Sequence, residues 1–198
     1  MGDLDEAVSG AVERGDDPRL NSVIAILVAL AATCMALGNI KDGNIAQAMS
    51  QAQSQTVDTW SYYQAKSTKQ NLAEATRDQL QALRATGSFS AAAAADLDKR
   101  IANYEAQVAR YEKEKAEIKT QAEGYQHQYE ELNLHDDQFD LSDASYSVAI
   151  ALLGVTALTR KQWLLGLAGV FLAVGVVFEV AGFLAWRLHP NALMSWLS

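Results

Sequence analysis

The chain has 198 residues, a formal net charge of −8, two prolines and one cysteine. The acidic balance argues against a nucleic-acid partner, which would need basic patches, and the single Cys34 excludes an internal disulfide. The sequence has no zinc-ligand spacing, Gly-rich phosphate loop or nucleophile motif, so we expect no cofactor and no enzymatic activity. Abundant Ala and Gln with so few helix breakers predict an all-α fold.

The first predicted element is a membrane span. Residues 20–40, LNSVIAILVALAATCMALGNI, follow a polar, acidic tail at 1–19 and carry no charge. At ~1.5 Å per residue this run crosses roughly 30 Å of hydrocarbon. A cleaved signal peptide is the alternative, but the tail before the run is acidic rather than basic and the run is too long. We therefore expect an uncleaved transmembrane helix at 20–40.

Residues 41–143 are predicted to form a long extramembrane antiparallel helical hairpin. Their only convincing break is RATGSFS at 84–90, where Gly87 can take a left-handed C-cap and Ser88 or Ser90 can N-cap the next helix. Folding the chain at Gly87 places Tyr62 opposite Glu112.

A heptad pattern follows the break. It predicts a left-handed coiled-coil seam, but its tyrosines and Lys115 are poor core residues for a simple dimer, so the seam is expected to be wide or shared with further neighbours. The seam positions are Leu97, Ile101, Tyr104, Val108, Tyr111, Lys115, Ile118, Ala122, Tyr125, Tyr129 and Leu132.

The returning arm is longer than the outgoing one, and HDDQFDLSD at 135–143 accounts for the surplus. We expect this segment to be a solvated, non-helical linker in which Ser142 or Asp143 caps the next span. Several oxygens on a flexible loop suit hard cations such as calcium, although the order of acids matches no established loop motif. The weak metal candidates are Asp136, Asp137, Asp140 and Asp143.

Two spans are predicted near the C-terminus. Residues 144–159 form the shorter one, and residues 163–186 form the longer one, bracketed by Trp163 and Trp186 as interfacial aromatics. A basic turn at 160–162 joins them. The tail at 187–198 is expected to lie on the membrane surface, with Leu193, Met194, Trp196 and Leu197 dipping in.

Glu179 is the most specific signal in the sequence, because a carboxyl group within a span is costly unless it is paired, protonated or hydrated. We expect it to face a neighbouring helix near Thr33, Cys34 or Ser147 and to lock helix packing. A ring of Glu179 carboxylates around a symmetry axis is the alternative. The helix face that carries it contains Ala168, Leu172, Gly175, Glu179, Gly182 and Trp186, whose small members permit close contact.

The stretch WSYYQAKSTKQNL, residues 60–72, resembles a motif of a family of uncharacterised bacterial membrane proteins, a domain of unknown function. Members are similar to this chain along nearly its whole length. They have an N-terminal span, a polar helical segment that opens with Trp-x-Tyr-Tyr-Gln-x-Lys, and two C-terminal spans joined by a basic turn such as LTRKQW. The resemblance implies a bacterial inner-membrane protein and implies no activity.

The motif also has a physical interpretation. Trp60, Tyr62 and Tyr63 cover more than one helix face, so we expect them to pack against the returning arm near Tyr104 and Tyr111 and against a second neighbour. Lys66 and Lys69 are expected to face the Glu-rich segment 112–117. Binding of an anionic ligand by these lysines is the alternative.

The distribution of basic residues favours a cytoplasmic N-terminus and a periplasmic hairpin. Arg14, Arg19, Arg160 and Lys161 lie on the first side, whereas only Lys41 and Arg187 lie near the spans on the second. The sequence therefore predicts an oligomeric, membrane-anchored coiled coil that acts as a scaffold or accessory component, with the lipid bilayer, further copies of itself and another envelope protein as partners. An ion-conducting or ion-sensing channel with Glu179 facing the axis is the alternative function.

Overall fold

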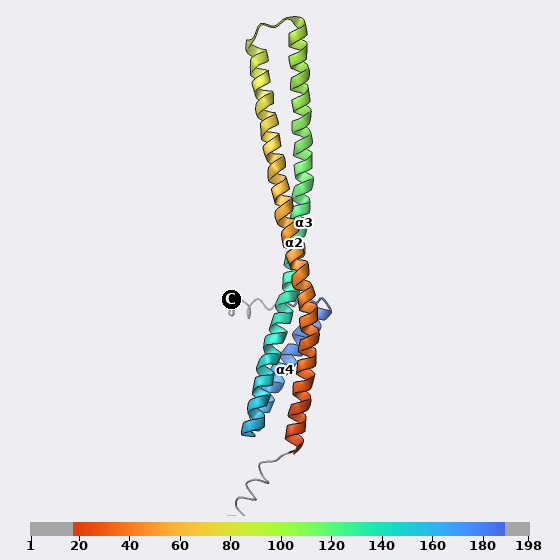
Figure 1. Cartoon of the computed structure of the whole chain (residues 1–198), viewed down its shortest axis with the longest axis vertical. Coiled ribbons are helices and arrows are strands. Elements are labelled where there is room, and N and C mark those ends of the chain that lie inside the picture. Colours follow the sequence, from red (N-terminus) through yellow and green to blue (C-terminus); the bar gives the residue numbers. More distant parts are fainter. Residues whose placement is uncertain (1–17, 189–198) are drawn as a thin grey trace, which may run out of the picture. The chain divides into compact units, whose positions relative to one another are not determined.

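The computed structural model describes residues 18–188, which contain three helices and no strand (Figure 1). The helices are α2 (Pro18–Thr86), α3 (Ala91–Thr159) and α4 (Gln162–Phe183). The expected acidic tail before Pro18 and the membrane-surface residues Leu193, Met194, Trp196 and Leu197 lie outside the described residues. Each of the three helices contains a segment that is long and apolar enough to cross a membrane. Within 18–188 the fold is therefore all-α.

The chain divides into two compact units. Residues 48–131 form a hairpin unit, built from the second half of α2 and the first half of α3. The described residues before 48 and after 131 form a three-helix unit, to which α2, α3 and α4 all contribute.

The prediction of a non-helical linker at 135–143 is wrong, because α3 continues without interruption from Ala91 to Thr159. Segment 135–143 contains no Gly or Pro, and its Phe139 and Leu141 are buried. Burial of this face outweighs the tendency of the intervening aspartates to stay in a solvated loop. Consequently Ser142 and Asp143 lie inside a helix and cap nothing, and α2 and α3 have the same length of 69 residues.

The break near Gly87 is the connection between α2 and α3, and the structure assigns residues 87–90 to it. Ser90 caps α3, since its Oγ accepts a hydrogen bond from the Ala93 N–H at 3.3 Å. Gly87, in contrast, does not adopt the predicted left-handed conformation. A Cβ at Gly87 would lie 2.3 Å from the Phe89 ring, so glycine is needed there for space rather than for its backbone freedom.

In the hairpin unit, α2 and α3 run side by side (Figure 1). The ten predicted α3 seam residues from Leu97 to Tyr129 are all buried or half-buried. On α2 the shielded residues also recur in steps of four and three, a pattern that the sequence analysis missed because half of its members are polar. This α2 seam consists of Met49, Ala52, Thr56, Thr59, Tyr63, Lys66, Gln70, Ala73, Arg77, Leu80 and Arg84.

Polar contacts fix the register between the two seams. Lys66 Nζ lies 2.5 Å from the Glu114 carboxylate, and Lys115 Nζ donates to Ser67 Oγ at 3.3 Å. The predicted pairing of Tyr62 with Glu112 is therefore displaced by about two helical turns. Part of the displacement arises because the connection extends to Ser90, so that α3 begins four residues after Gly87.

The α3–α4 contact in the three-helix unit repeats every seven residues. Large side chains of α3 lie against small residues of α4: the Tyr146 ring would be 2.8 Å from a Cβ at Gly175, and the Phe139 ring would be 2.7 Å from one at Gly182. One further heptad along, Leu153 packs in a cluster with Ala168 and with Ile24 of α2. These contacts bring the antiparallel helices α3 and α4 into close approach.

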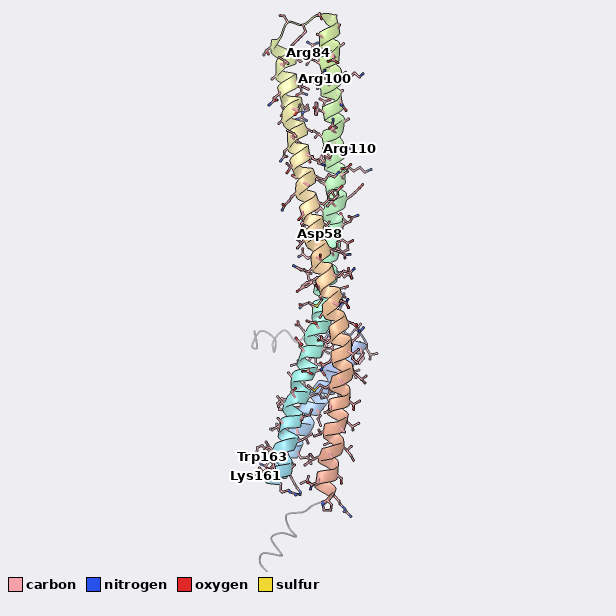
Figure 2. All side chains as sticks on the ribbon, viewed as in Figure 1. Asp58, Arg84, Arg100, Arg110, Lys161 and Trp163 are labelled. Carbon is pink, nitrogen blue, oxygen red and sulfur yellow. The ribbon has the colours of Figure 1, made fainter. Side chains whose placement is uncertain are left out.

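Short turns limit α4 at both ends. Arg160 has a positive φ of 58° in the two-residue connection after α3, and Figure 2 places Lys161 and Trp163 at this turn. Helix α4 ends at Phe183, three residues before the predicted end of the span. Ala185 then has a φ of 53°, and the Trp186 N–H donates to the Ala181 carbonyl at 2.9 Å.

The register of the hairpin can be tested by disulfide formation. In a Cys34→Ala background, we expect Ala73→Cys and Val108→Cys to crosslink within one chain, because both positions belong to seams that face each other in the register of Lys66 with Glu114. The matched control pairs Ala73→Cys with Ile101→Cys, which the sequence-predicted register would place opposite. Non-reducing electrophoresis after proteolysis between the two cysteines distinguishes them, and preferential crosslinking of the control pair would contradict the structure.

Candidate functional site: a buried carboxyl group between α3 and α4

Glu179 lies inside the three-helix unit and is only 6% exposed. The Tyr146 hydroxyl of α3 donates a hydrogen bond to Glu179 Oε2 at 2.6 Å, and the Tyr146 side chain is itself fully buried. A carboxyl group removed from water requires such a donor, because an unsatisfied buried acceptor is costly. The buried Glu179 carboxyl of α4 is thus hydrogen-bonded by the Tyr146 hydroxyl of the same chain.

The heptad contact explains why these two side chains meet. Tyr146 packs over Gly175, and its hydroxyl reaches Glu179 one helical turn further along α4. One turn before Tyr146 on α3, Ser142 Oγ donates to the Gly175 carbonyl at 2.9 Å. Because glycine has no side chain, its backbone is accessible to both neighbours. Two hydrogen bonds therefore cross the α3–α4 contact within one turn.

Helix α2 closes the third side of the site. A Cβ at Gly38 would lie 3.5 Å from Glu179 Oε1 and 3.7 Å from the Phe139 ring, so α2 approaches the carboxyl group through another small residue. A cavity of about 10 Å³ lies between α2 and α3, with Cys34, Gly38, Ser142 and Tyr146 among its lining residues. This volume is about the least that can hold one water molecule.

Of the three expected neighbours of Glu179, which were Thr33, Cys34 and Ser147, only Cys34 lines the adjoining cavity. Thr33 Oγ1 donates to the Ala29 carbonyl of its own helix, and Ser147 is exposed. The partner is instead Tyr146, one residue before Ser147. A signal for it was present in the sequence, since Phe139, Tyr146 and Leu153 are large residues at the same seven-residue spacing as Gly182, Gly175 and Ala168.

Gln138 is a further buried polar residue that sequence reasoning missed. Its Nε2 donates to the carbonyls of Trp186 and Leu188, both at 2.8 Å, and its Oε1 lies 3.1 Å from His135 Nδ1. One side chain thereby satisfies two carbonyls beyond the end of α4. The contact fixes the backbone that follows this helix.

The predicted acidic segment contributes an electrostatic cluster at the surface of the three-helix unit. Burial raises the pKa of the Asp136 carboxyl to about 6, and the nearby charge of Asp42 and a hydrogen bond with its carboxylate add to the effect. Burial also raises the pKa of Asp137 and of Asp140. When all these carboxyls are ionised, Asp42 Oδ1 is a buried acceptor without a hydrogen-bond partner, so a proton on Asp136 relieves both the repulsion and the missing bond.

The weak metal candidates do not assemble into a ligand set. Among residues 18–188 no group of three or more His, Cys, Asp or Glu side chains has an arrangement that could hold a metal ion. On the continuous helix, Asp136, Asp140 and Asp143 share one face and Asp137 lies about 100° away, whereas a calcium loop would wrap its oxygens around one point.

In the hairpin unit, the aromatic motif surrounds lysines instead of forming an apolar cluster. Lys66 lies over the rings of Tyr62 and Tyr111, with 5.2 Å and 5.5 Å to their centroids, and Lys115 lies 5.2 Å from the centroid of Tyr63. The Glu114 carboxylate and the Tyr62 hydroxyl hold the pKa of Lys66 above its ordinary value. These contacts place cations on the electron-rich ring faces.

The Trp60 ring packs edge-on against Tyr63, with 5.4 Å between centroids. Tyr62 is 53% exposed and so does not pack into the returning arm. Tyr104 lines a groove together with Lys69 and Gln107.

These features define an all-helical protein with three membrane-competent helices and a buried tyrosine–carboxyl pair. The model of the family described as "Domain of unknown function (DUF4337)" matches residues 20–185, so the chain belongs to that family. Neither the curated proteins nor the solved structures give a match to it.

The close α3–α4 approach predicts that Gly175→Ala destabilises the three-helix unit. The added Cβ would lie 2.8 Å from the Tyr146 ring, and overpacking of this kind costs about 1–3 kcal/mol. Gly169→Ala is the matched control on the same helix, because nothing lies within 4 Å of a Cβ there. Thermal unfolding in detergent should show a lower midpoint for Gly175→Ala alone. Equal midpoints for the two variants would argue against this helix contact.

The Asp136 carboxyl predicts a pH dependence of stability. Its pKa rises from an ordinary value of 3.8 to about 6 on folding, so the folded state binds its proton more tightly than the unfolded state. Stability from this group is full below about pH 4 and is lost as the pH rises through about 6. Asp136→Asn should flatten this part of the pH profile of the unfolding midpoint and raise stability at neutral pH.

The exposed acid Glu117 supplies the control: Glu117→Gln should leave the profile of the wild type between about pH 4 and 6 unchanged. An Asp136→Asn profile as steep as that of the wild type would show that this carboxyl is not the titrating group.

Proposed function

We propose that the chain is a membrane-anchored scaffold of the bacterial inner membrane, in which three spans hold a helical coiled-coil hairpin outside the bilayer. The observation that carries this proposal is the in-chain pairing of Glu179 with Tyr146. A carboxyl group that is satisfied within its own chain serves helix packing and needs neither ion nor ligand. The three helices that are long and apolar enough to cross a membrane support the membrane location, and the bacterial inner membrane is what the resemblance of residues 60–72 implies.

The hairpin unit supports a role in assembly rather than catalysis. Its two facing seams mix apolar residues such as Leu80 and Val108 with alanine, threonine, lysine and tyrosine, and such side chains form an extended contact without a deep enclosed site. We accordingly place the hairpin on the periplasmic side, where the predicted orientation puts it. The partners in this proposal are the bilayer, further copies of the chain and another component of the envelope.

The alternative function, a channel with Glu179 on a symmetry axis, has less support. A residue that lines an axial pore must face away from its own bundle, whereas Glu179 is shielded by α2 and α3 of the same chain. Charged rings select ions through direct access to the pore water. The adjoining cavity of about 10 Å³ is too small to conduct ions.

Substitution of Glu179 tests the proposal. Glu179→Gln should keep the protein folded and membrane-inserted, since the amide oxygen can still accept from Tyr146. Glu179→Leu should weaken the three-helix unit by order ~1 kcal/mol, typical of one interhelical hydrogen bond in a membrane. Unfolding of the purified protein in mixed micelles measures both effects.

Conductance measurements on proteoliposomes separate the two functions. The scaffold predicts little ion flux from the wild type and from Glu179→Gln alike. A large cation-selective conductance that Glu179→Gln abolishes would contradict the scaffold and establish the channel.

A further inference from the structure

Large apolar side chains are exposed on only one of the two helices of the hairpin unit. Those of Val57, Tyr62, Leu72 and Leu83 are 54%, 53%, 68% and 50% exposed, and all four belong to α2. In the described part of the unit, α3 exposes none of comparable size. Single exposed apolar residues are common on protein surfaces, whereas a contiguous row of them marks an interaction site. Whether these four side chains are aligned therefore decides if they form such a site.

Three of these four residues lie on one stripe of α2 that runs beside the seam. We call this set the α2 stripe: Asp58, Tyr62, Ala65, Lys69, Leu72, Thr76, Gln79 and Leu83, which recur in steps of four and three. Such spacing keeps a row of side chains facing a second long helix over several turns. The α2 seam is already occupied by α3, so the stripe can serve only an additional helix.

Helix α2 of the hairpin unit also carries fewer charged side chains than α3. Over residues 48–76, α2 carries four charged side chains, whereas α3 carries eleven over the equally long range 103–131. One of those on α2 is paired within the chain, as Lys66 forms an ion pair with Glu114, and the nearby charge of Lys69 also lowers the pKa of that carboxyl. On the stripe, Asp58 (labelled in Figure 2) and Lys69 are exposed charges of opposite sign. A solvated helix face is normally rich in charges, so the composition of α2 indicates a covered face.

A groove of about 380 Å³ lies directly beside Leu72. Leu72 and Thr76 of α2 and Tyr104 and Tyr111 of α3 are among its lining residues. Well-packed protein contacts leave few spaces larger than a water molecule. The groove is therefore large enough to take side chains from outside the hairpin unit.

We propose that a second copy of this chain covers the stripe, with α2 of one copy packed in parallel along α2 of the other. The inference rests on the proposed function, because copies anchored in one membrane carry their hairpins on the same side and hold equal residues at equal heights. A two-fold contact is then self-complementary. Leu72 of each copy meets the groove that begins at Leu72 of the other, and a stripe with so few charges does not repel its equivalent.

The composition of the seams gives this contact an energetic role. Thr56, Thr59, Lys66, Gln70, Arg77 and Arg84 occupy six of the eleven α2 seam positions, so this helix contributes little apolar surface to the core of the hairpin. Stability from apolar burial scales with the area removed from water. Covering Tyr62, Leu72 and Leu83 adds the apolar burial that the seam lacks.

Single-cysteine crosslinking of the full chain in proteoliposomes tests the contact. In a Cys34→Ala background, Leu72→Cys should give a disulfide-linked dimer on oxidation. Asn71→Cys is the matched control, because the neighbouring residue is exposed but points about 100° away around the helix. We expect at least about tenfold less dimer from Asn71→Cys, and equally little from Ala106→Cys on the exposed face of α3.

A charge substitution supplies an independent measurement. Leu72→Glu should raise the dimer dissociation constant in detergent at least about tenfold, whereas Asn71→Glu should leave it unchanged, both measured by light scattering. Circular dichroism checks that each variant is folded, and crosslinking at Leu83→Cys reports the same contact if Leu72→Glu unfolds. An oligomeric wild type in which Leu72→Cys crosslinks no better than Asn71→Cys would overturn the stripe contact and leave the scaffold intact. A monomeric wild type in membranes would overturn both.

Discussion

The three-helix unit depends on the match between large side chains of α3 and small residues of α4. Gly175 and Gly182 leave room for the rings of Tyr146 and Phe139, and only this approach brings the Tyr146 hydroxyl to Glu179. At the spacing of an ordinary helix contact the carboxyl group would have no donor, at a cost of several kcal/mol in an apolar surrounding. The polar site is thus a product of the packing, and the packing accounts for the glycines.

The hairpin unit uses the same seven-residue period with a different chemistry. Lysine ammonium groups lie on tyrosine rings and beside carboxylates where a conventional seam would have leucine. Such contacts depend on alignment, so they specify register more than they add stability. Lys66 shows the combination most clearly, since it pairs with Glu114 and lies over Tyr111 of the opposing helix.

Apolar periodicity predicted those parts of the fold in which apolar residues define the contact. The α3 seam from Leu97 to Tyr129 is shielded throughout the hairpin unit, and the glutamate on the small-residue face of α4 is buried. The α2 seam escaped prediction because its period is carried by residues such as Thr59 and Gln70, which hydropathy treats as surface.

The segment 135–143 was mistaken for a loop for a related reason. Its four aspartates favoured a solvated loop, although Phe139 is apolar and the segment contains no Gly or Pro to break a helix. Tyr146 was missed as the partner of Glu179, because a hydrogen-bond partner depends on register, and the sequence alone gave the α3–α4 register only through the spacing of large and small residues.

The two-residue connection between α3 and α4 has a consequence for biogenesis. Transfer of α4 alone into lipid is unfavourable, because it carries Glu179. A long connection between α3 and α4 would separate the insertion of Glu179 from that of its partner Tyr146. Only Arg160 and Lys161 lie between the helices. The end of α3 and the start of α4 therefore leave the ribosome in immediate succession. Under the proposed membrane location, Tyr146 is then already available when Glu179 leaves water, so the two helices can enter the bilayer together with the Tyr146–Glu179 hydrogen bond formed.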